Sequence, residues 1–582
     1  MPLARYVAAH WIDHAKSGGM ASSVLQLILH LFTSESAPLK NWIRMCNIDA
    51  ESYEEHSMLW DEVDVCSVLY YSALAGMQEV SDCLLQRGEN ANAEGGRLGS
   101  ALQAASYGGY EEIVKLLLEN GAELNMKGGI YGNALQAASF SGNKAIVKLL
   151  LVNGAEVNAE GGMFGSPLLA AASYGDVEIV KLLLENGAEV NAKGGEFGYA
   201  LQAASFGGSE ANVKLLLENG AEVNAEGGEY GNALNAASKE SNEVMVKLLL
   251  ENGAEVNAIA KGRSCGNALH AAASYRDNQD NVAIVKLLLQ NGAEVNAKGG
   301  EYGYALQAAS FENETEAIMK ILLENGAEMN AKGGMFGNAL HAASFGGSEM
   351  NVRLLLENGA EVNAEGVPYG YALQAAVASN SASYQVKATI VKLLLENGAE
   401  VNAKGGKYGS ALQAASLRGY EGVVKLLLEN GAEVNAEGGE YGNALYAAVT
   451  PYDQDQVNVV IVKLLLENGA EVNAKGGGEF GNALQAVSFE CNETITKLLL
   501  QNGADVNAEG GKYGNALQAA VARAAHRTVL RLRPYNLRPY FYKISRYPYR
   551  KVIFKKPDGT VRVKKRVYGR IYGFLRRHSK IK

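Results

Sequence analysis

A repeat of about 33 residues constrains this chain more than any other feature of its sequence. Thirteen glycines, most of them preceded by Asn, return at steps of 33 residues, with a few steps of 34, 38 or 39. They are Gly88, Gly121, Gly154, Gly187, Gly220, Gly253, Gly292, Gly326, Gly359, Gly398, Gly431, Gly469 and Gly503. A unit of this size cannot bury its own apolar face, so the period predicts a solenoid whose neighbouring copies share one core.

The copy that begins at Tyr131, YGNALQAASFSGNKAIVKLLLVNGAEVNA, shows what one unit contains. Asn133 followed by Gln136 is the arrangement of a capping box and predicts that a helix starts after Asn133. In other copies we expect Asn or Ser, with Gln or His, to keep this cap chemistry. The apolar run 145–152 predicts a second helix, which Gly154 ends in the left-handed conformation. We expect the Gly-rich segment that follows to be an extended loop.

The period, the predicted helix pair and the motif L-L-L-x-x-G-A-x-V-N-A resemble the ankyrin repeat family over roughly residues 67–520. The resemblance implies an all-α solenoid of stacked helix pairs with extended loops. It also implies non-catalytic protein–protein recognition or scaffolding. Two departures are N-A-L-Q in place of the family's usual T-P-L-H, and an aromatic residue in the loop motif G-G-x-Y/F-G.

The repeats divide the chain into five expected regions. Residues 1–62 form a helical N-terminal cap, and residues 63–95 form a divergent first repeat. Residues 96–514 are the ankyrin array, and residues 515–536 are a divergent capping repeat. Residues 537–582 are a basic, Tyr-rich tail. We expect a monomer.

Three features of the sequence suggest a narrower group of ankyrin proteins: the segments PLARYVAAHWIDHA and VLYYSALAG and the repeated motif G-G-x-Y-G-N-A-L-Q-A-A-S. They resemble the ankyrin-bearing C-terminal halves of fungal NOD-like receptors of the NACHT type. This resemblance implies the sensor-type half of an innate-immunity-like receptor. The phosphate-binding motif G-x-x-x-x-G-K-[ST] of the nucleotide-binding half does not occur in the sequence.

Aromatic residues recur once per repeat in the loop motif and have two interpretations. They are candidate partner-binding anchors, because Tyr and Phe are favoured in interface cores. Alternatively each ring packs against the next loop, an interpretation that strict recurrence favours. The candidates are Tyr131, Phe164, Phe197, Tyr230, Tyr302, Phe336, Tyr369, Tyr408 and Tyr441, and Phe480 and Tyr513 continue the series.

Three inserts lengthen the turn between the two helices of a repeat, beginning near Tyr275, Val377 and Val449. If partners distinguish this array by its sequence, this variable edge is where its distinctive residues lie. The ankyrin resemblance instead implies contacts through the loop tips and first helices, which look nearly uniform here. The alternative is neutral drift in a solvated turn.

The end of the chain is electrostatically opposite to the rest. From Arg523 to Lys582 there are 20 Lys and Arg and a single acid, whereas the remainder carries 33 basic and 62 acidic residues. Basic residues interleaved with tyrosines suit RNA or single-stranded DNA, which makes nucleic-acid binding the alternative function. The candidate residues are Arg546, Arg550, Lys551, Lys564, Lys565 and Arg566.

Three other interpretations of this tail compete with nucleic-acid binding. It folds back on the acidic repeats, it is a nuclear import signal around residues 564–566, or it is an aberrant gene-model end. Within it, the sequence KKPDG predicts the turn of a hairpin between two short strands.

Catalytic, metal and cofactor sites have little support in the sequence, and we expect a non-enzyme without a cofactor or metal. His10 and His14 have helical spacing but no third ligand nearby, while His270 and His341 fit the capping position as hydrogen-bonding groups. Five scattered cysteines favour a reducing compartment. We expect a cytoplasmic protein, with the nucleus as the alternative, because the sequence shows no secretory signal or membrane span.

Overall fold

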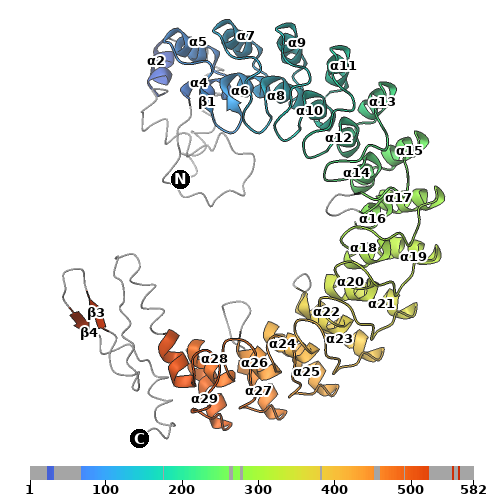
Figure 1. Ribbon diagram of the computed structural model, residues 1–582, viewed down its shortest axis with the longest axis vertical. Coiled ribbons are helices and arrows are strands. Elements are labelled where there is room, and N and C mark those ends of the chain that lie inside the picture. Colours follow the sequence, from blue (N-terminus) through green and yellow to red (C-terminus); the bar gives the residue numbers. More distant parts are fainter. Residues whose placement is uncertain are drawn as a thin grey trace. The chain divides into compact units, whose positions relative to one another are not determined.

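A computed structural model describes residues 22–31, 67–174, 176–260, 266–274, 279–379, 383–450, 459–490, 492–523, 553–555 and 561–563. The chain divides into two compact units, Met1–Glu301 and Tyr302–Lys582. Each unit is an array of helix pairs joined by short hairpins (Figure 1). The expected all-α solenoid of stacked helix pairs is therefore confirmed.

Unit 1 holds seven helix pairs within its described residues. The first helices are α4 (Val68–Leu74), α6 (Ala101–Gly108), α8 (Ala134–Phe140), α10 (Pro167–Tyr174), α12 (Ala200–Phe206), α14 (Ala233–Lys239) and α16 (Ala268–Ala273). The second helices are α5 (Gln78–Gln86), α7 (Glu111–Glu119), α9 (Lys144–Val152), α11 (Val177–Glu185), α13 (Glu210–Glu218), α15 (Glu243–Glu251) and α17 (Gln279–Gln290). Before them, α2 (Ser22–Leu31) packs against α5.

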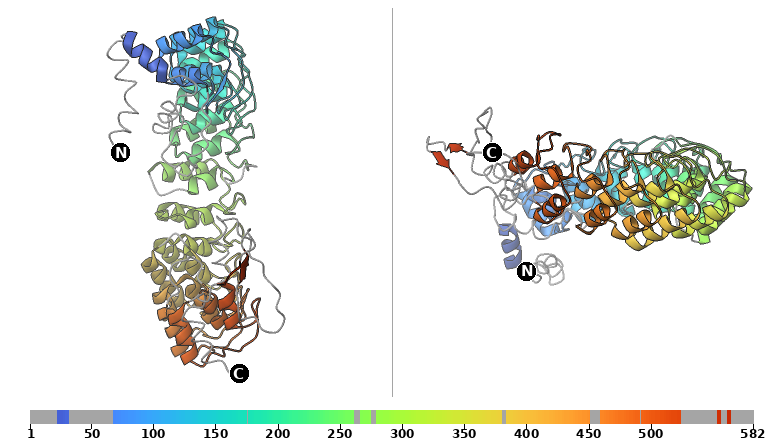
Figure 2. Two further views of the ribbon diagram at one scale, coloured as in Figure 1. Left: turned by 90° about the vertical axis from the view of Figure 1, so that its left-hand side faces the viewer. Right: turned by 90° about the horizontal axis from the view of Figure 1, so that it is seen from below.

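Unit 2 continues the pattern with six described pairs, whose successive helices lie side by side in Figure 2. The first helices are α18 (Ala305–Phe311), α20 (Ala339–Gly346), α22 (Ala372–Ala378), α24 (Ala411–Arg418), α26 (Ala444–Val449) and α28 (Ala483–Glu490). The second helices are α19 (Glu316–Glu324), α21 (Glu349–Glu357), α23 (Tyr384–Glu396), α25 (Glu421–Glu429), α27 (Val459–Glu467) and α29 (Glu493–Gln501). Residues 516–523 are also helical.

The core lies between the two helix layers and between neighbouring repeats. In α9 the side chains of Ile146, Val147 and Leu150 are buried, as the apolar run predicts. In α8 Ala137 and Ala138 are fully buried, and the small alanines let α8 pack closely on α6 and α10. Burial of one Leu or Ile side chain stabilises the fold by about 1.5–3 kcal/mol, so each repeat depends on neighbours that complete its core.

The helix ends mostly follow the cap chemistry expected from the sequence. Asn133 Oδ1 accepts a hydrogen bond from the Gln136 backbone N–H at 2.8 Å, and Gly154 ends α9 with a φ of 92°. The expectation that Asn or Ser caps the first helix is wrong for three repeats. Tyr199, Tyr304 and Tyr371 stand there and make no side-chain cap bond, because a Tyr hydroxyl cannot reach back to its own helix start.

The structure describes parts of the two ends of the array. The divergent first repeat forms the pair α4 and α5, and the divergent last repeat forms the helical residues 516–523. Strands β3 (Ile553–Lys555) and β4 (Val561–Val563) pair antiparallel, which confirms the predicted hairpin around KKPDG. Within the described residues, no helix is both long and apolar enough to cross a membrane.

Candidate functional site

The segment between repeats, which we expected to be an extended loop, forms a short hairpin. In most repeats two glycines pair across the turn, as Gly128 pairs with Gly132, and strands β1 (Glu94–Gly95) and β2 (Gly99–Ser100) form the same turn earlier in the chain. Gly162 has a φ of 62°, and a Cβ on it would lie 2.2 Å from the carbonyl carbon of Tyr131. Only glycine permits this approach between successive hairpins.

In several hairpins the tip residue, which is the x of G-G-x-Y/F-G, bonds to the tip of a neighbouring repeat through its backbone. In unit 1 the N–H of Ile130 donates to the carbonyl of Arg97 at 3.0 Å, and Met163 donates to Ile130 at 2.8 Å. Glu196 and Glu229 extend the series at 3.0 and 2.8 Å. In unit 2 the N–H of Glu440 donates to Lys407 at 3.0 Å. The tips therefore stack at the spacing of neighbouring β-strands, about 4.8 Å.

The side chains on this ladder differ from repeat to repeat, although the backbone is the same. We call these residues the tip column: Arg97, Ile130, Met163, Glu196, Glu229 and Glu301 in unit 1, and Met335, Pro368, Lys407, Glu440, Glu479 and Lys512 in unit 2. Most of them are exposed to solvent. The impression of uniform loop tips in the sequence is thus wrong at one position, whose variability could have been found by aligning the repeats on G-G-x-Y/F-G.

Ion pairs join some neighbouring tips. Lys407 Nζ lies 3.5 Å from a carboxylate oxygen of Glu440, and Lys512 Nζ lies 3.0 Å from Glu479. The hydrogen bond to Glu479 raises the pKa of Lys512. In unit 1, by contrast, the side chains of the tip column change from basic at Arg97 through apolar at Ile130 and Met163 to acidic from Glu196 onward.

The nine predicted aromatic residues all lie just behind the tip column. Five are buried: Tyr131, Phe164, Phe197, Phe336 and Tyr408. The other four are half-buried: Tyr230, Tyr302, Tyr369 and Tyr441. Several of these rings face rings of adjacent repeats, with centroids 6.1 Å apart for Tyr131 and Phe164 and 6.2 Å apart for Phe164 and Phe197. These contacts are the ones expected of rings that pack between loops.

A second set of rings, at the ends of the first helices, was missed by the sequence reasoning. Phe140 ends α8 and lies between Tyr131 at 4.9 Å and Phe164 at 4.8 Å. The half-buried members of this set are Tyr107, Phe140, Phe206, Phe311, Phe345 and Phe489. The signal in the sequence is the Phe or Tyr that directly follows Q-A-A-S or its close variants.

Together the two sets form three ring stacks. The first ring stack runs through unit 1 and consists of Tyr107, Tyr131, Phe140, Phe164, Phe197, Phe206 and Tyr230. The second ring stack, in unit 2, consists of Tyr302, Phe311, Phe336, Phe345 and Tyr369. The third ring stack consists of Phe480, Phe489 and Tyr513. Aromatic pairs contribute about 0.5–1.5 kcal/mol beyond area burial, so the stacks hold successive hairpins in register.

In most repeats a Gln at the third position of the first helix ties the hairpin of the next repeat to that helix. Gln136 Nε2 donates to the carbonyl of Gly161 at 2.9 Å, and Gln413 Nε2 donates to Gly442 at 3.0 Å. His341 stands at the same position, with Nδ1 2.7 Å from Asn338 Oδ1 and Nε2 3.3 Å from the Gly370 carbonyl. This confirms its predicted hydrogen-bonding role, which His270 shares through Asn267 at 2.7 Å.

Burial lowers the pKa of His341 to about 4, although the Gly370 carbonyl acts in the opposite direction. The imidazole is therefore neutral at physiological pH. Its place in the hydrogen-bonded loop support leaves it no access to solvent, with 1% of its surface exposed. It is a structural group and not a candidate catalytic base.

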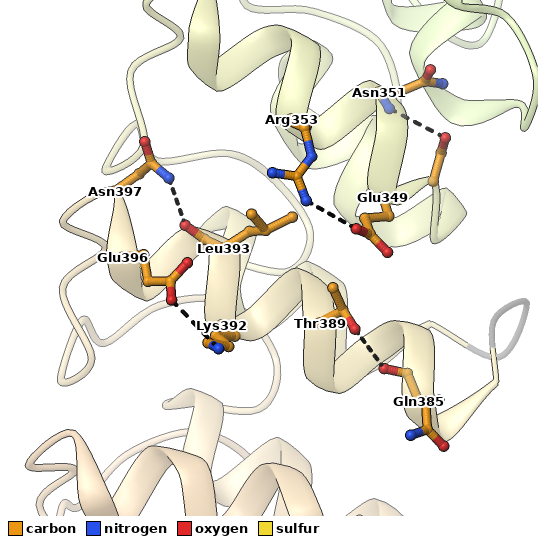
Figure 3. Close-up of polar contacts among 10 residues, drawn as sticks. Glu349, Asn351, Arg353, Gln385, Thr389, Lys392, Leu393, Glu396 and Asn397 are labelled. Carbon is orange, nitrogen blue, oxygen red and sulfur yellow. Dashed lines mark hydrogen bonds and ion pairs between the residues drawn. The ribbon is translucent and has the colours of Figure 1, made fainter.

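The outer face of the second helices carries a contrasting, repetitive set of charges (Figure 3). Arg353 pairs with Glu349 one turn away on α21 at 3.0 Å, and Lys392 pairs with Glu396 on α23 at 3.7 Å. The pair Lys320 and Glu316 on α19 follows the same spacing. Exposed pairs of this kind stabilise a helix by only a few tenths of a kcal/mol. This face is solvated and nearly identical from repeat to repeat.

Part of the inserted sequence between helices is itself helical. The helices α17 and α23 have 12 and 13 residues, whereas α15 has nine. On the added turn of α23, the buried Lys387 Nζ lies 3.1 Å from the Tyr420 hydroxyl, and the ring of the exposed Tyr384 lies 5.1 Å from that of Tyr420. The remaining insert residues, 275–278, 380–382 and 451–458, lie outside the described residues.

Several predicted residues fall where the structure gives no description. The basic candidates Arg546, Arg550, Lys551, Lys564, Lys565 and Arg566 lie outside the described residues, as do His10 and His14. Among the residues that are described, no group of three or more His, Cys, Asp or Glu side chains could hold a metal ion.

Comparisons with known proteins agree with the repeat geometry. A family model described as ankyrin repeats in three copies matches residues 134–227, 201–299, 269–366, 305–405 and 380–476. A second, described as ankyrin repeats in many copies, matches residues 102–151. No curated protein matches the chain. Ankyrin repeats imply protein–protein interaction in general. The matches span residues 102–476, well over half of the 582 residues, and the chain belongs to the ankyrin repeat family.

Proposed function

We propose that this protein is a non-catalytic recognition scaffold that binds a protein partner with its hairpin surface. This surface comprises the tip column and the half-buried edges of the ring stacks. The observation that carries the proposal is a backbone ladder that stays constant while its side chains change from Arg97 through Met163 to Glu229. A constant frame with variable side chains is suited to selecting one partner among many.

The chemistry of the tip column in unit 1 fits an interface. Ile130 and Met163 are apolar, and Met163 is 39% exposed, which supplies an adaptable apolar contact. Glu196 and Glu229 follow at the next two tips and are exposed. The partner segment is expected to carry an apolar patch next to Lys or Arg, because an interface pairs apolar with apolar surface and opposite charges.

Among the predicted aromatic anchors, we assign partner contact to the four half-buried rings. Tyr230, Tyr302, Tyr369 and Tyr441 keep part of their surface accessible beside the tips. Tyr is well suited to this role because it offers a large rigid contact area and a polar hydroxyl. The five buried rings support the hairpins from behind.

The test removes tip side chains and leaves the repeats intact. In the full chain, Met163→Ser, Glu196→Ser and Glu229→Ser are combined and compared with Lys181→Ser, Lys214→Ser and Lys247→Ser, which lie on the exposed outer face of the same repeats. Quantitative affinity capture from cell extract should lose its specific partners with the tip variant and keep them with the outer-face variant. Equal capture by the two variants would contradict the proposal.

The inserts remain a second proposed contact region at the other edge of the repeat. The exposed Tyr384 beside the fixed pair Lys387 and Tyr420 supports this idea, because it offers an aromatic side chain on a rigid base. Tyr384→Ser should weaken partner capture if this edge contributes, and it should leave capture unchanged if the inserts are only solvated turns.

Two finer proposals rest on the sequence alone. The phrases PLARYVAAHWIDHA and VLYYSALAG support a role as the sensor-type half of an innate-immunity-like receptor in the cytoplasm. This role requires a nucleotide-binding partner protein, which affinity capture would reveal.

The alternative function is nucleic-acid binding by the basic tail in the cytoplasm or nucleus. Its test is fluorescence anisotropy with RNA and single-stranded DNA across a salt series. The full chain is compared with a variant in which Arg546, Arg550, Lys551, Lys564, Lys565 and Arg566 are changed to Ser. Nucleic-acid binding predicts an affinity that falls with salt and a shallower salt slope for the variant.

A further inference from the structure

Cationic side chains of this chain already lie over rings of the hairpin surface. Lys239 Nζ is 5.0 Å from the centroid of Tyr230, at the end of the first ring stack. The Arg418 guanidinium is 6.0 Å from the ring of Tyr408, and Lys512 Nζ is 5.5 Å from that of Tyr513. These distances are those of cation–π contacts, so the hairpin surface accepts Lys and Arg in its own fold.

The third ring stack holds the first basic residue of the tail. The Arg523 guanidinium lies 5.2 Å from the ring centroid of Phe489, and one of its nitrogens lies 3.2 Å from a carboxylate oxygen of Glu490. Arg523 is the last residue of the helical segment 516–523. The chain that follows therefore starts beside the third ring stack, with one cation already bound to it.

Charge and composition match the tail to this surface. From Arg523 to Lys582 the chain has 20 Lys and Arg and one acid, whereas the remainder has 33 basic and 62 acidic residues. Exposed acids on the hairpins of the third ring stack include Glu479 and Glu509. The tail is tethered next to the stack, so its first residues dock with only a small loop-closure cost.

We propose that residues 524–582 dock on the third ring stack of their own chain, with Arg523 as the first contact of a series. Arginine and tyrosine side chains of the tail lie against Phe480, Phe489 and Tyr513 and pair with nearby carboxylates. The docked tail covers this part of the hairpin surface, and a partner that binds there must displace it. The proposal is independent of which partner the tip column recognises.

Limited trypsin digestion of the full chain tests the docking, because trypsin cleaves after Lys and Arg. Intact-mass spectrometry follows the rate of cleavage within residues 524–582, and this rate is normalised to that of a peptide substrate. The normalised rate should be about fivefold slower at about 50 mM than at about 500 mM NaCl. Phe480→Leu combined with Tyr513→Leu should abolish the low-salt protection. Tyr302→Leu combined with Phe336→Leu, in the second ring stack, is the matched control and should retain it.

A charge variant keeps the test valid if the leucine variants fold poorly, which circular dichroism would show. Glu490→Gln removes the carboxylate that holds Arg523 and should weaken the protection. Glu324→Gln, an exposed glutamate at the end of α19, should not. Zero-length carboxyl–amine cross-linking of the unmodified chain should join tail lysines to Glu479, Glu490 or Glu509.

Four outcomes would overturn the proposal. Tail cleavage that does not depend on salt would show that no electrostatic docking occurs. Equal loss of protection in the two leucine variants would place the contact elsewhere. Protection that rises with protein concentration would assign the tail to a second copy of the chain. Protection that arises only when RNA is added would assign it to nucleic acid. None of these results depends on partner capture, so failure here and failure of the proposed function are separate.

Discussion

The ring stacks of the two units differ in continuity. In unit 1 seven rings follow one another from Tyr107 to Tyr230, whereas in unit 2 a run of five and a run of three lie on either side of Tyr408 and Tyr441. The loop aromatics are present in both regions. The units also differ at the ends of the first helices, where Phe140, Ser173 and Phe206 in unit 1 correspond to Ala378, Leu417 and Thr450 in unit 2.

This comparison shows that a ring at the end of a first helix adds contacts to the loop aromatics on either side of it. Phe140 lies within 5 Å of both Tyr131 and Phe164, whose own ring centroids are 6.1 Å apart. Phe164 and Phe197 stack directly at 6.2 Å, with Ser173 at the helix end between them. Around Tyr408 the structure uses a different contact, since Arg418 lies over the ring and donates a hydrogen bond to its hydroxyl at 3.2 Å. A cation therefore lies over a ring in each unit, at Tyr230 where the first ring stack ends and at Tyr408 between the two stacks of unit 2.

The largest expected effect comes from breaking the first ring stack at its centre. Phe164→Ala should lower the free energy of unfolding by about 3–4 kcal/mol, because a buried ring is removed and three neighbouring rings lose contact. Tyr408→Ala should cost about 1 kcal/mol less, since its ring contacts a guanidinium. Urea unfolding followed by circular dichroism measures both. Equal losses would show that stack continuity adds nothing to the stability of the hairpins.

Gln136 and His341 occupy the same position in repeats of different units, and both support a hairpin. The pH dependence of stability should distinguish the two, because only His341 can take up a proton. Burial lowers the pKa of His341 to about 4, below the value of about 6.5 expected in the unfolded chain. The stability that this group confers is present above pH 6.5 and is lost as the pH falls toward 4. The loss is about 3 kcal/mol, because the unfolded state takes up the proton first.

His341→Gln places the residue of most other repeats at this position and should flatten that part of the profile. Urea unfolding at about pH 7 and about pH 4.5 compares the variant with the original chain, which also serves as the control for titrating carboxylates. The same pH profile in both proteins would contradict a neutral buried imidazole.

The smallest effect is expected from extending the third ring stack. Thr450→Phe places a ring at the helix-end position between Tyr441 and Phe480 and should raise the free energy of unfolding by about 0.5–1 kcal/mol. The gain is reduced by loss of the Thr450 hydroxyl bond to the Tyr446 carbonyl. Thr450→Val, which removes the hydroxyl and adds no ring, is the control. A thermal melt that ranks the phenylalanine variant below the valine variant would show that unit 2 cannot accept the bridging ring.

Much of the fold could be predicted from the sequence, because its signals are local and repeated. The Asn133 cap, the Gly154 helix end and the buried face of α9 follow from residues within one repeat. The expected Asn or Ser cap is absent at Tyr199, and the repeated short motif gave no warning of this exception. The tip column was missed for a similar reason, since one variable position is easily hidden among glycines.

The sequence by itself determined the ankyrin repeat, its period and the recurrence of one aromatic residue per loop. Only the tertiary structure decided what those residues do. Successive hairpins approach until backbone N–H and carbonyl groups of residues such as Ile130 and Met163 pair across repeats, and rings such as Phe140 then fit between loops. These contacts join residues about one repeat apart, so no local propensity encodes them. Packing alone separates the buried rings from the side chains left facing solvent.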